Sequence, residues 1–294
     1  MRTLGLVFTF SFFVLSTSVS FAQTPMKTKS AVEWQSIIVP RINPLGLFAA
    51  SSLSYRLKLY DSELDLLKNN FVRVAAQPWV SPSWFRPGVR LDLQPLSILK
   101  LSVSHEFLFH FGTFGILQSF ESPTEDYSET RLDLGKEAGE NYRPVGQQTT
   151  FSVLLQAKVG PVAVRNNAKL ALTNFPLRQG DTVFYDQLLD ILVQGSGWNF
   201  VDDVDLLFLT DFGLIAGLRY TLTQAYYDDD TSTTHRLGPL ITYKFLDNPD
   251  EVLSEVTGIL LANWWLKHPY RTGQETSQAI PYLGVGVKLA GKLY

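Results

Sequence analysis

Histidine is the side chain best suited to proton transfer near neutral pH, and this chain has four, His105, His110, His235 and His268. His235 follows the acidic run Asp228–Asp230, and a carboxylate beside an imidazole can support a general base. That pairing is generic, because a histidine in a connecting segment is commonly held by water or by a nearby carboxylate. His235 with Asp228–Asp230 is therefore the one candidate that the sequence offers for a hydrolase acting on lipid or peptide.

The sequence carries no other pattern that specifies a reaction. It contains no zinc motif, no phosphate-binding glycine loop and no nucleophile elbow, and it has no cysteine. We therefore expect no enzymatic activity, no cofactor and no metal site. With 25 basic and 28 acidic residues and a formal net charge of −3, a general nucleic-acid binder is also not expected.

The first 22 residues have the three parts of a secretory signal peptide. Arg2 supplies the positive charge, Leu4–Leu15 is the apolar stretch, and Ser20-Phe21-Ala22 offers small residues for cleavage. Cleavage after Ala22 is expected, with an uncleaved membrane anchor as the alternative. Residues 23–294 contain no proline-rich or glycine- and serine-rich linker, so we expect one domain there.

Much of the chain alternates apolar and polar residues with a period of two, which is typical of β-strands with two different faces. In the clearest case Phe151, Val153 and Leu155 share one face, and Ser152 and Gln156 lie on the other. The turn residues Gly160-Pro161 follow, and the alternation then resumes from Val162. Twelve such strands are predicted, with ten or fourteen as alternatives, near residues 33–42, 47–59, 70–80, 85–95, 98–111, 149–159, 162–174, 199–210, 214–226, 235–246, 256–267 and 280–293.

The segment Phe184–Val193 has apolar residues at a spacing closer to helical than alternating, and it is predicted to form a short helix within a loop. Several aromatic residues lie near strand ends and are expected to form interfacial girdles: Trp79, Trp84, Trp198, Trp264, Trp265, Tyr226 and Tyr282.

The amphipathic final segment, which ends at Tyr294, and the alternating strands before it resemble Gram-negative outer-membrane β-barrel proteins. The resemblance covers the signal peptide and most of residues 45–294 and is architectural. It implies an all-β fold, a transmembrane antiparallel up-and-down barrel in the bacterial outer membrane. It also implies contact with membrane lipid and lipopolysaccharide, and recognition of Tyr294 by the barrel-assembly machinery. Tyr294 is one residue out of phase with the apolar face, and a bulge would restore the phase. A secreted soluble β protein is the alternative.

In such a barrel the long connections 112–148, 175–198, 227–234 and 268–279 would lie outside the cell and the short turns in the periplasm. The polar faces of the strands would line the lumen. Basic residues outnumber acidic ones on these faces, which would favour anions if water fills the interior. We therefore expect a narrow passive pore, or a structural barrel if side chains or an inward-folded loop fill it. The basic residues assigned to the lumen are Arg86, Arg90, Lys100, Lys158, Arg165, Lys169, Arg219, Arg236 and Lys244.

Overall fold

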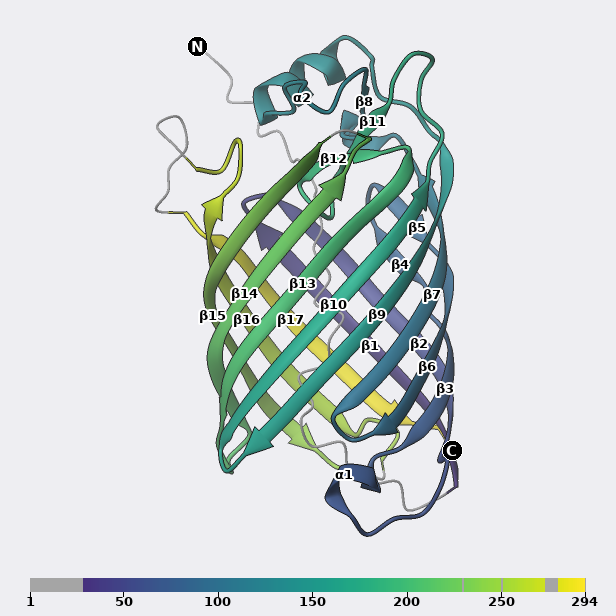
Figure 1. Ribbon diagram of the computed structural model, residues 1–294, viewed down its shortest axis with the longest axis vertical. Helices are drawn as coiled ribbons and strands as arrows, with labels where there is room; N and C mark the ends of the chain where they lie inside the picture. Colours follow the sequence, from purple (N-terminus) through teal and green to yellow (C-terminus); the bar gives the residue numbers. More distant parts are fainter. Residues whose placement is uncertain (1–28, 229, 250, 273–279, 294) are drawn as a thin grey trace.

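The computed structural model describes residues 29–228, 230–249, 251–272 and 280–293. The predicted signal peptide and the terminal Tyr294 lie outside these ranges, as does Asp229. The described chain forms a closed antiparallel barrel of twelve strands (Figure 1). Its strands are β1 (Ser30–Ile42), β2 (Gly46–Leu57), β3 with β4 (Phe71–Ala76 and Trp79–Ser81), β5 with β6 (Trp84–Arg86 and Gly88–Leu96), β7 (Leu99–His110), β9 (Val145–Val159), β10 (Val162–Asn174), β13 (Ser196–Leu209), β14 (Leu214–Tyr226), β15 (Thr231–Asp247), β16 (Glu255–Lys267) and β17 (Tyr282–Lys292).

The ring closes between β1 and β17, where Glu33 pairs with Lys292 and Ile42 with Leu283. Closure gives every strand two hydrogen-bonded neighbours, so the barrel has no free edge. All twelve predicted strands are present. The two largest differences at strand starts are β9, which begins at Val145, and β15, which begins at Thr231.

Two prolines interrupt neighbouring strands at the same level. Pro78 separates β3 from β4, and Pro87 separates β5 from β6. Proline has no N–H for the ladder, but its carbonyl still accepts, and the Phe107 N–H donates to the Pro87 carbonyl at 3.0 Å. The interrupted pairs therefore each act as one barrel strand.

The connections divide between two ends of the barrel (Figure 1). Long connections after β7 and β10 lie at one end, here called the loop end, together with η1 (Thr113–Gly115), β8 (Ser119–Phe120) and α2 (Glu129–Glu137). Short turns, among them Gly160-Pro161, lie at the other, here called the turn end. The longer segment that carries α1 (Asp65–Lys68) is also at the turn end. None of the described helices is long and apolar enough to cross a membrane.

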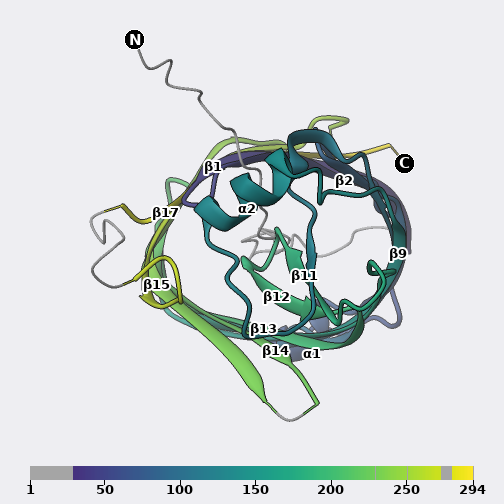
Figure 2. The ribbon, with the colours of Figure 1, turned by 90° about the horizontal axis from the view of Figure 1, so that it is seen from above.

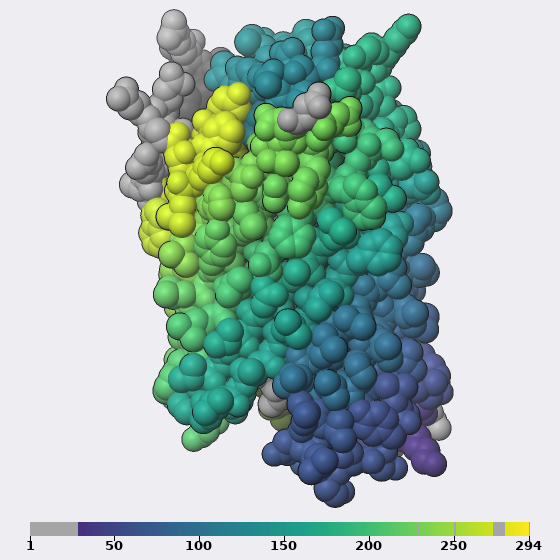
Figure 3. All heavy atoms as spheres, in the orientation of Figure 1, coloured from purple at the N-terminus to yellow at the C-terminus, as the bar shows by residue number. Residues whose placement is uncertain are grey.

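The outer face of the wall is apolar. The outward positions of adjacent strands expose large side chains, among them Phe151, Leu155, Val164 and Leu206. Figure 3 shows the outer surface of the wall on the face it presents. A polar exception on this face is Asp202, whose carboxylate accepts from Asn166 Nδ2 at 2.6 Å. A soluble protein rarely exposes so much contiguous apolar surface, whereas hydrocarbon around a closed barrel requires it.

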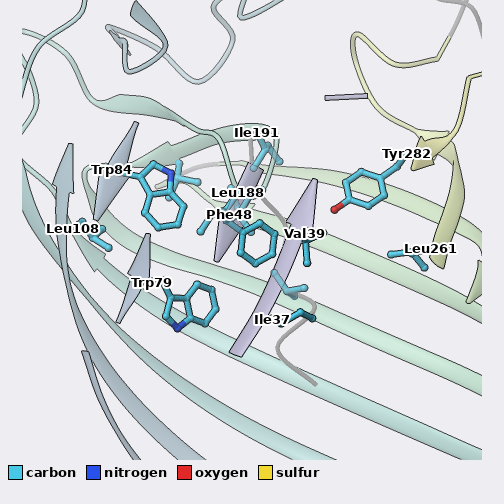
Figure 4. Packing of buried hydrophobic residues seen from close by; sticks show 14 of the residues in the cluster. Ile37, Val39, Phe48, Trp79, Trp84, Leu108, Leu188, Ile191, Leu261 and Tyr282 are labelled. Carbon is cyan, nitrogen blue, oxygen red and sulfur yellow. The ribbon is translucent and has the colours of Figure 1, made fainter. Parts of the chain in front are cut away.

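The prediction of aromatic girdles is wrong for four residues, one of which is Trp265, which packs against the buried lumen cluster. Trp79, Trp84 and Tyr282 are buried inside the barrel (Figure 4), while Trp198 and Trp264 are exposed on the wall. The reason is the strand phase. Phe85 takes the outward position beside Trp84, so the indole ring of Trp84 must point into the lumen.

The predicted helix at Phe184–Val193 is also wrong. The segment forms an antiparallel hairpin of β11 (Val183–Asp186) and β12 (Ile191–Gln194), and β11 also pairs with β8. Viewed from the loop end, this inner hairpin lies within the ring of strands (Figure 2). Its residues from Val183 to Val193 are all buried, and a strand buried on both faces has no reason to alternate.

Candidate functional site in the barrel lumen

The inner hairpin packs against apolar side chains that the wall directs into the lumen. Leu188 and Ile191 of the hairpin belong to one buried cluster with Phe48, Trp84 and Tyr282 of the wall (Figure 4). The members of this cluster come from strands on several sides of the ring, so the hairpin fills the lumen at this level.

The turn of the hairpin is held by its own acidic residues. Asp186 Oδ1 accepts from the backbone N–H of Leu188 at 2.6 Å and of Leu189 at 3.1 Å. Asp190 closes the turn with φ 56°, in the left-handed region that Asp and Asn tolerate better than most residues. The turn is fastened to the wall by Arg41, whose Nη2 donates to the Gln187 carbonyl at 2.8 Å.

Asp190 is the centre of a polar group at the loop end, here called the hairpin-tip cluster, formed with Tyr185, His268 and Arg271. Its carboxylate accepts from Tyr185 Oη at 2.6 Å and from Arg271 Nε at 3.0 Å, and lies 3.3 Å from His268 Nε2. Arg271 Nη1 also donates to Glu129 of α2 at 2.5 Å. Burial opposes the charge on Asp190, but Arg271 and His268 outweigh it and hold the pKa of Asp190 well below its usual range.

The Asp190–His268 pair has the composition of a catalytic dyad but not the required free nitrogen. His268 Nε2 lies 2.8 Å from the Asp190 carbonyl, which can only accept, and Nδ1 accepts from the Tyr270 backbone N–H at 3.0 Å. Both ring nitrogens are therefore engaged within the protein, and both side chains are buried. The geometry is that of a structural contact between the inner hairpin and the segment after β16.

The structure does not join the residues of the predicted hydrolase site. His235 lies on β15, and its Nδ1 is 2.5 Å from Tyr220 Oη. Asp228 instead accepts from Gln194 Nε2 at 3.1 Å, and Asp230 accepts from the Thr231 N–H. Among the described residues, no hydrogen bond or ion pair links His235 to either acid.

The other two histidines belong neither to the hairpin-tip cluster nor to the predicted hydrolase site. His105 Nδ1 is 2.9 Å from Thr149 Oγ1, and His110 is buried against Phe175 inside the barrel.

Below the hairpin, the lumen is filled by ion pairs between neighbouring strands. Asp205 accepts from Arg165 Nη2 at 2.5 Å and from Arg219 Nε at 2.6 Å. Asp203 accepts from Lys169 at 2.9 Å. These are the side-chain ladders that the sequence left open as an alternative to a water-filled interior.

Most of the basic residues assigned to the lumen are buried or partly buried. Lys158 differs, because it is exposed at the end of β9 where the wall stops. Lys244 pairs with Asp247 at 3.0 Å, near the turn end. Arg86, Arg165, Arg219 and Arg236 are buried, and Arg90, Lys100, Lys169 and Lys244 are partly buried.

Sequence reasoning missed two acids that offset the basic wall. Glu33 pairs with Arg56 at 2.6 Å and Glu255 with Lys288 at 3.0 Å. Glu255 was missed because it lies one residue before the predicted strand 256–267. Glu33 was missed because no inward and outward faces were assigned to the predicted first strand, 33–42. The hairpin-tip cluster was missed because its members lie on two connections, one between β10 and β13 and one after β16, whose meeting depends on the closed ring.

Two spaces in the lumen lie among these charged side chains. One, of about 100 Å³, lies beneath the inner hairpin and is lined by residues that include Arg86, Lys100, Glu106 and Asn167. The other, of about 150 Å³, lies near the turn end, where Arg56, Lys244 and Lys288 each face a carboxylate partner.

A closed twelve-stranded antiparallel barrel with an apolar outer face is the architecture of the Gram-negative outer-membrane β-barrel proteins. No protein-family model and no curated protein sequence matches this chain.

Similar solved structures are outer-membrane barrels. LpxR from Salmonella typhimurium is 9% identical with a TM-score of 0.39, over 88% of this chain and 99% of that one. The translocator domain of the autotransporter NalP from Neisseria meningitidis is 11% identical with a TM-score of 0.40, over 90% and 88%. OccD3 from Pseudomonas aeruginosa is 9% identical with a TM-score of 0.34, over 97% and 98%. Resemblances this distant say nothing of function.

Proposed function

We propose that this protein is a non-enzymatic barrel of the bacterial outer membrane whose lumen is closed at rest by its own inner hairpin. Conduction then requires displacement of the hairpin and favours anions. The observation that carries the proposal is the burial of Val183–Val193 inside the ring of strands. The apolar outer face supports a lipid environment, with lipopolysaccharide at the outer leaflet and the barrel-assembly machinery as the route of insertion. Nucleic acid is not a proposed partner.

Displacing the hairpin would expose a wall richer in cations than in acids. Asp203 and Asp205 already neutralise Lys169, Arg165 and Arg219 in part, so the preference for anions is expected to be moderate. Fixed positive charge raises the local concentration of anions and lowers that of cations in a narrow water-filled passage.

The test compares the intact protein with a variant in which Val183–Gln194 is replaced by a short Gly-Ser linker. The intact barrel should show rare, brief openings in planar bilayers. The variant should conduct steadily, with a reversal potential across a salt gradient that indicates anion preference. Heat-modifiable gel migration confirms that both are folded barrels. Steady conduction by the intact protein, or cation preference in the variant, contradicts the proposal.

The hydrolase alternative has its own test. A lipid-hydrolysis assay on the purified barrel should give no activity above buffer, and His235→Ala should change nothing. Activity that depends on His235 would show that the protein is an enzyme.

A further inference from the structure

We propose that the space beneath the inner hairpin is a binding site for a small oxygen anion, either a carboxylate or an inorganic oxyanion. The space measures about 100 Å³, and a buried water needs roughly 10–15 Å³ of such volume. It therefore has room for an anion of a few heavy atoms as well as for several waters. This site does not depend on whether the barrel conducts.

The first observation is that the unpartnered polar atoms on the lining are donors. Arg86 Nε and Asn167 Nδ2 are buried with no hydrogen-bond partner among the described residues, and both side chains are more than nine-tenths buried. A buried donor without an acceptor is costly. Two such donors on one cavity indicate that its occupant accepts hydrogen bonds.

The second observation is the charge of the same lining. The Arg86 guanidinium lies over the Trp84 ring, 5.0 Å from the ring centroid, and makes no hydrogen bond to the described residues. Lys100 also lines the space, and no described residue accepts a hydrogen bond from its ammonium group. Arg86 lies at one end of the space, because its neighbour Phe85 pairs with Phe109 of β7. Lys100 lies at the other end, level with Asn167, because both residues pair with Leu154. A small anion at that end would therefore meet Lys100 and Asn167 together.

The acidic residues on the lining have partners of their own. Glu106 Oε1 accepts from Gln77 Nε2 at 2.8 Å, and Asp186 Oδ1 accepts from the backbone N–H groups of the hairpin turn. Their charges attract Arg86 electrostatically and limit the affinity for a second anion. We therefore expect weak binding of a small anion rather than capture of a polyphosphate.

The wider space at the turn end provides a contrast. Its cations Arg56, Lys244 and Lys288 each have a carboxylate within ion-pair distance. An anion there would compete with partners already present, so charge alone does not make that space a site.

The experiment measures thermal unfolding of the folded, detergent-solubilised barrel against rising phosphate or acetate, with chloride adjusted to keep the ionic strength constant. A ligand that binds only the folded state raises Tm in proportion to its occupancy. The intact protein should show a saturable rise. Lys100→Met removes one cation of the site and should weaken the apparent affinity about tenfold or more. Lys244→Met removes one lumen charge from the other space and should leave the affinity unchanged.

Asn167→Leu is the second variant. It removes an unpartnered donor and keeps a similar volume, so Tm without added anion should not fall, while the anion-dependent rise should shrink. The absence of a saturable rise for both anions would mean that the space holds water only and would overturn the proposal. An equal loss of apparent anion affinity in Lys244→Met and Lys100→Met would overturn the proposal as well, since the effect would then come from the total charge of the lumen and not from this site.

Discussion

The Asp190→Asn variant tests how the inner hairpin is held. The amide is nearly the same size as the carboxylate, and Asn tolerates the left-handed backbone that φ 56° at this position requires. The change removes the charge that Arg271 and His268 face in the hairpin-tip cluster. Arg271 keeps its contact with Glu129, so the cation is not left alone.

The magnitude follows from the contacts that are weakened. A hydrogen bond to a charged group contributes about 1.5–3 kcal/mol, and the Asp190 carboxylate accepts such bonds from Arg271 at 3.0 and 3.3 Å. Because one amide oxygen still accepts, we expect a loss of about 3 kcal/mol for the closed position of the hairpin. At 1.4 kcal/mol for each factor of ten, the displaced state should become roughly a hundredfold more populated.

The assay is the fraction of time that single barrels conduct in planar bilayers. Asp228→Asn is the matched control. Asp228 also contacts the hairpin, through Gln194 at 3.1 Å, but it is exposed, and an exposed contact adds little. An unchanged open fraction in Asp190→Asn, with heat-modifiable migration intact, would refute the view that the hairpin-tip cluster holds the hairpin closed.

Further predictions concern pH, the lumen and the wall. The pKa of Asp190 is lowered in the folded protein, so the stabilisation of the closed hairpin by its carboxylate is fully present above about pH 4 and is lost as pH falls through the folded pKa. The open fraction should therefore rise in acid. Asp190→Asn should abolish that rise. Asp205→Asn leaves two buried guanidinium groups short of a partner and should lower the free energy of unfolding in urea by about 3–5 kcal/mol, whereas Asp61→Asn at an exposed pair should have little effect. Phe151→Arg, at an outward mid-strand position, should cost about 2–4 kcal/mol in lipid vesicles; Val159→Arg, at the strand end, should cost much less, and equal costs would contradict a bilayer around the wall.

The strands could be predicted because two different environments face each one. Along β9 the outward Phe151, Val153 and Leu155 alternate with Ser152 and Gln156, and a period of two is visible in the sequence without any tertiary contact. The alternation also predicts which face a side chain occupies. Trp84 shares its phase with Arg86, which was assigned to the lumen, and that shared phase was the signal that Trp84 is not a girdle residue.

The inner hairpin could not be recognised in the same way. Val183–Val193 is surrounded by protein, so both faces are apolar and the period carries no information. The same cause explains why the predicted strand 256–267, which is β16 in the structure, is apolar on both faces. Its inward Ile259 and Leu261 pack in the lumen core with the hairpin, so a polar lumen face would be wrong at that level.

The apolar lumen residues also limit how the barrel can open. Complete withdrawal of the hairpin would expose Leu188, Ile191 and Val193, which are buried in one cluster with wall residues. Burial of one such side chain contributes about 1.5–3 kcal/mol, so their combined loss exceeds that of the hairpin-tip cluster. Withdrawal would also leave Ile259 and Leu261 of the wall facing water. Opening should therefore begin with release of the turn around Asp190, while the strands β11 and β12 keep part of their contact with the wall.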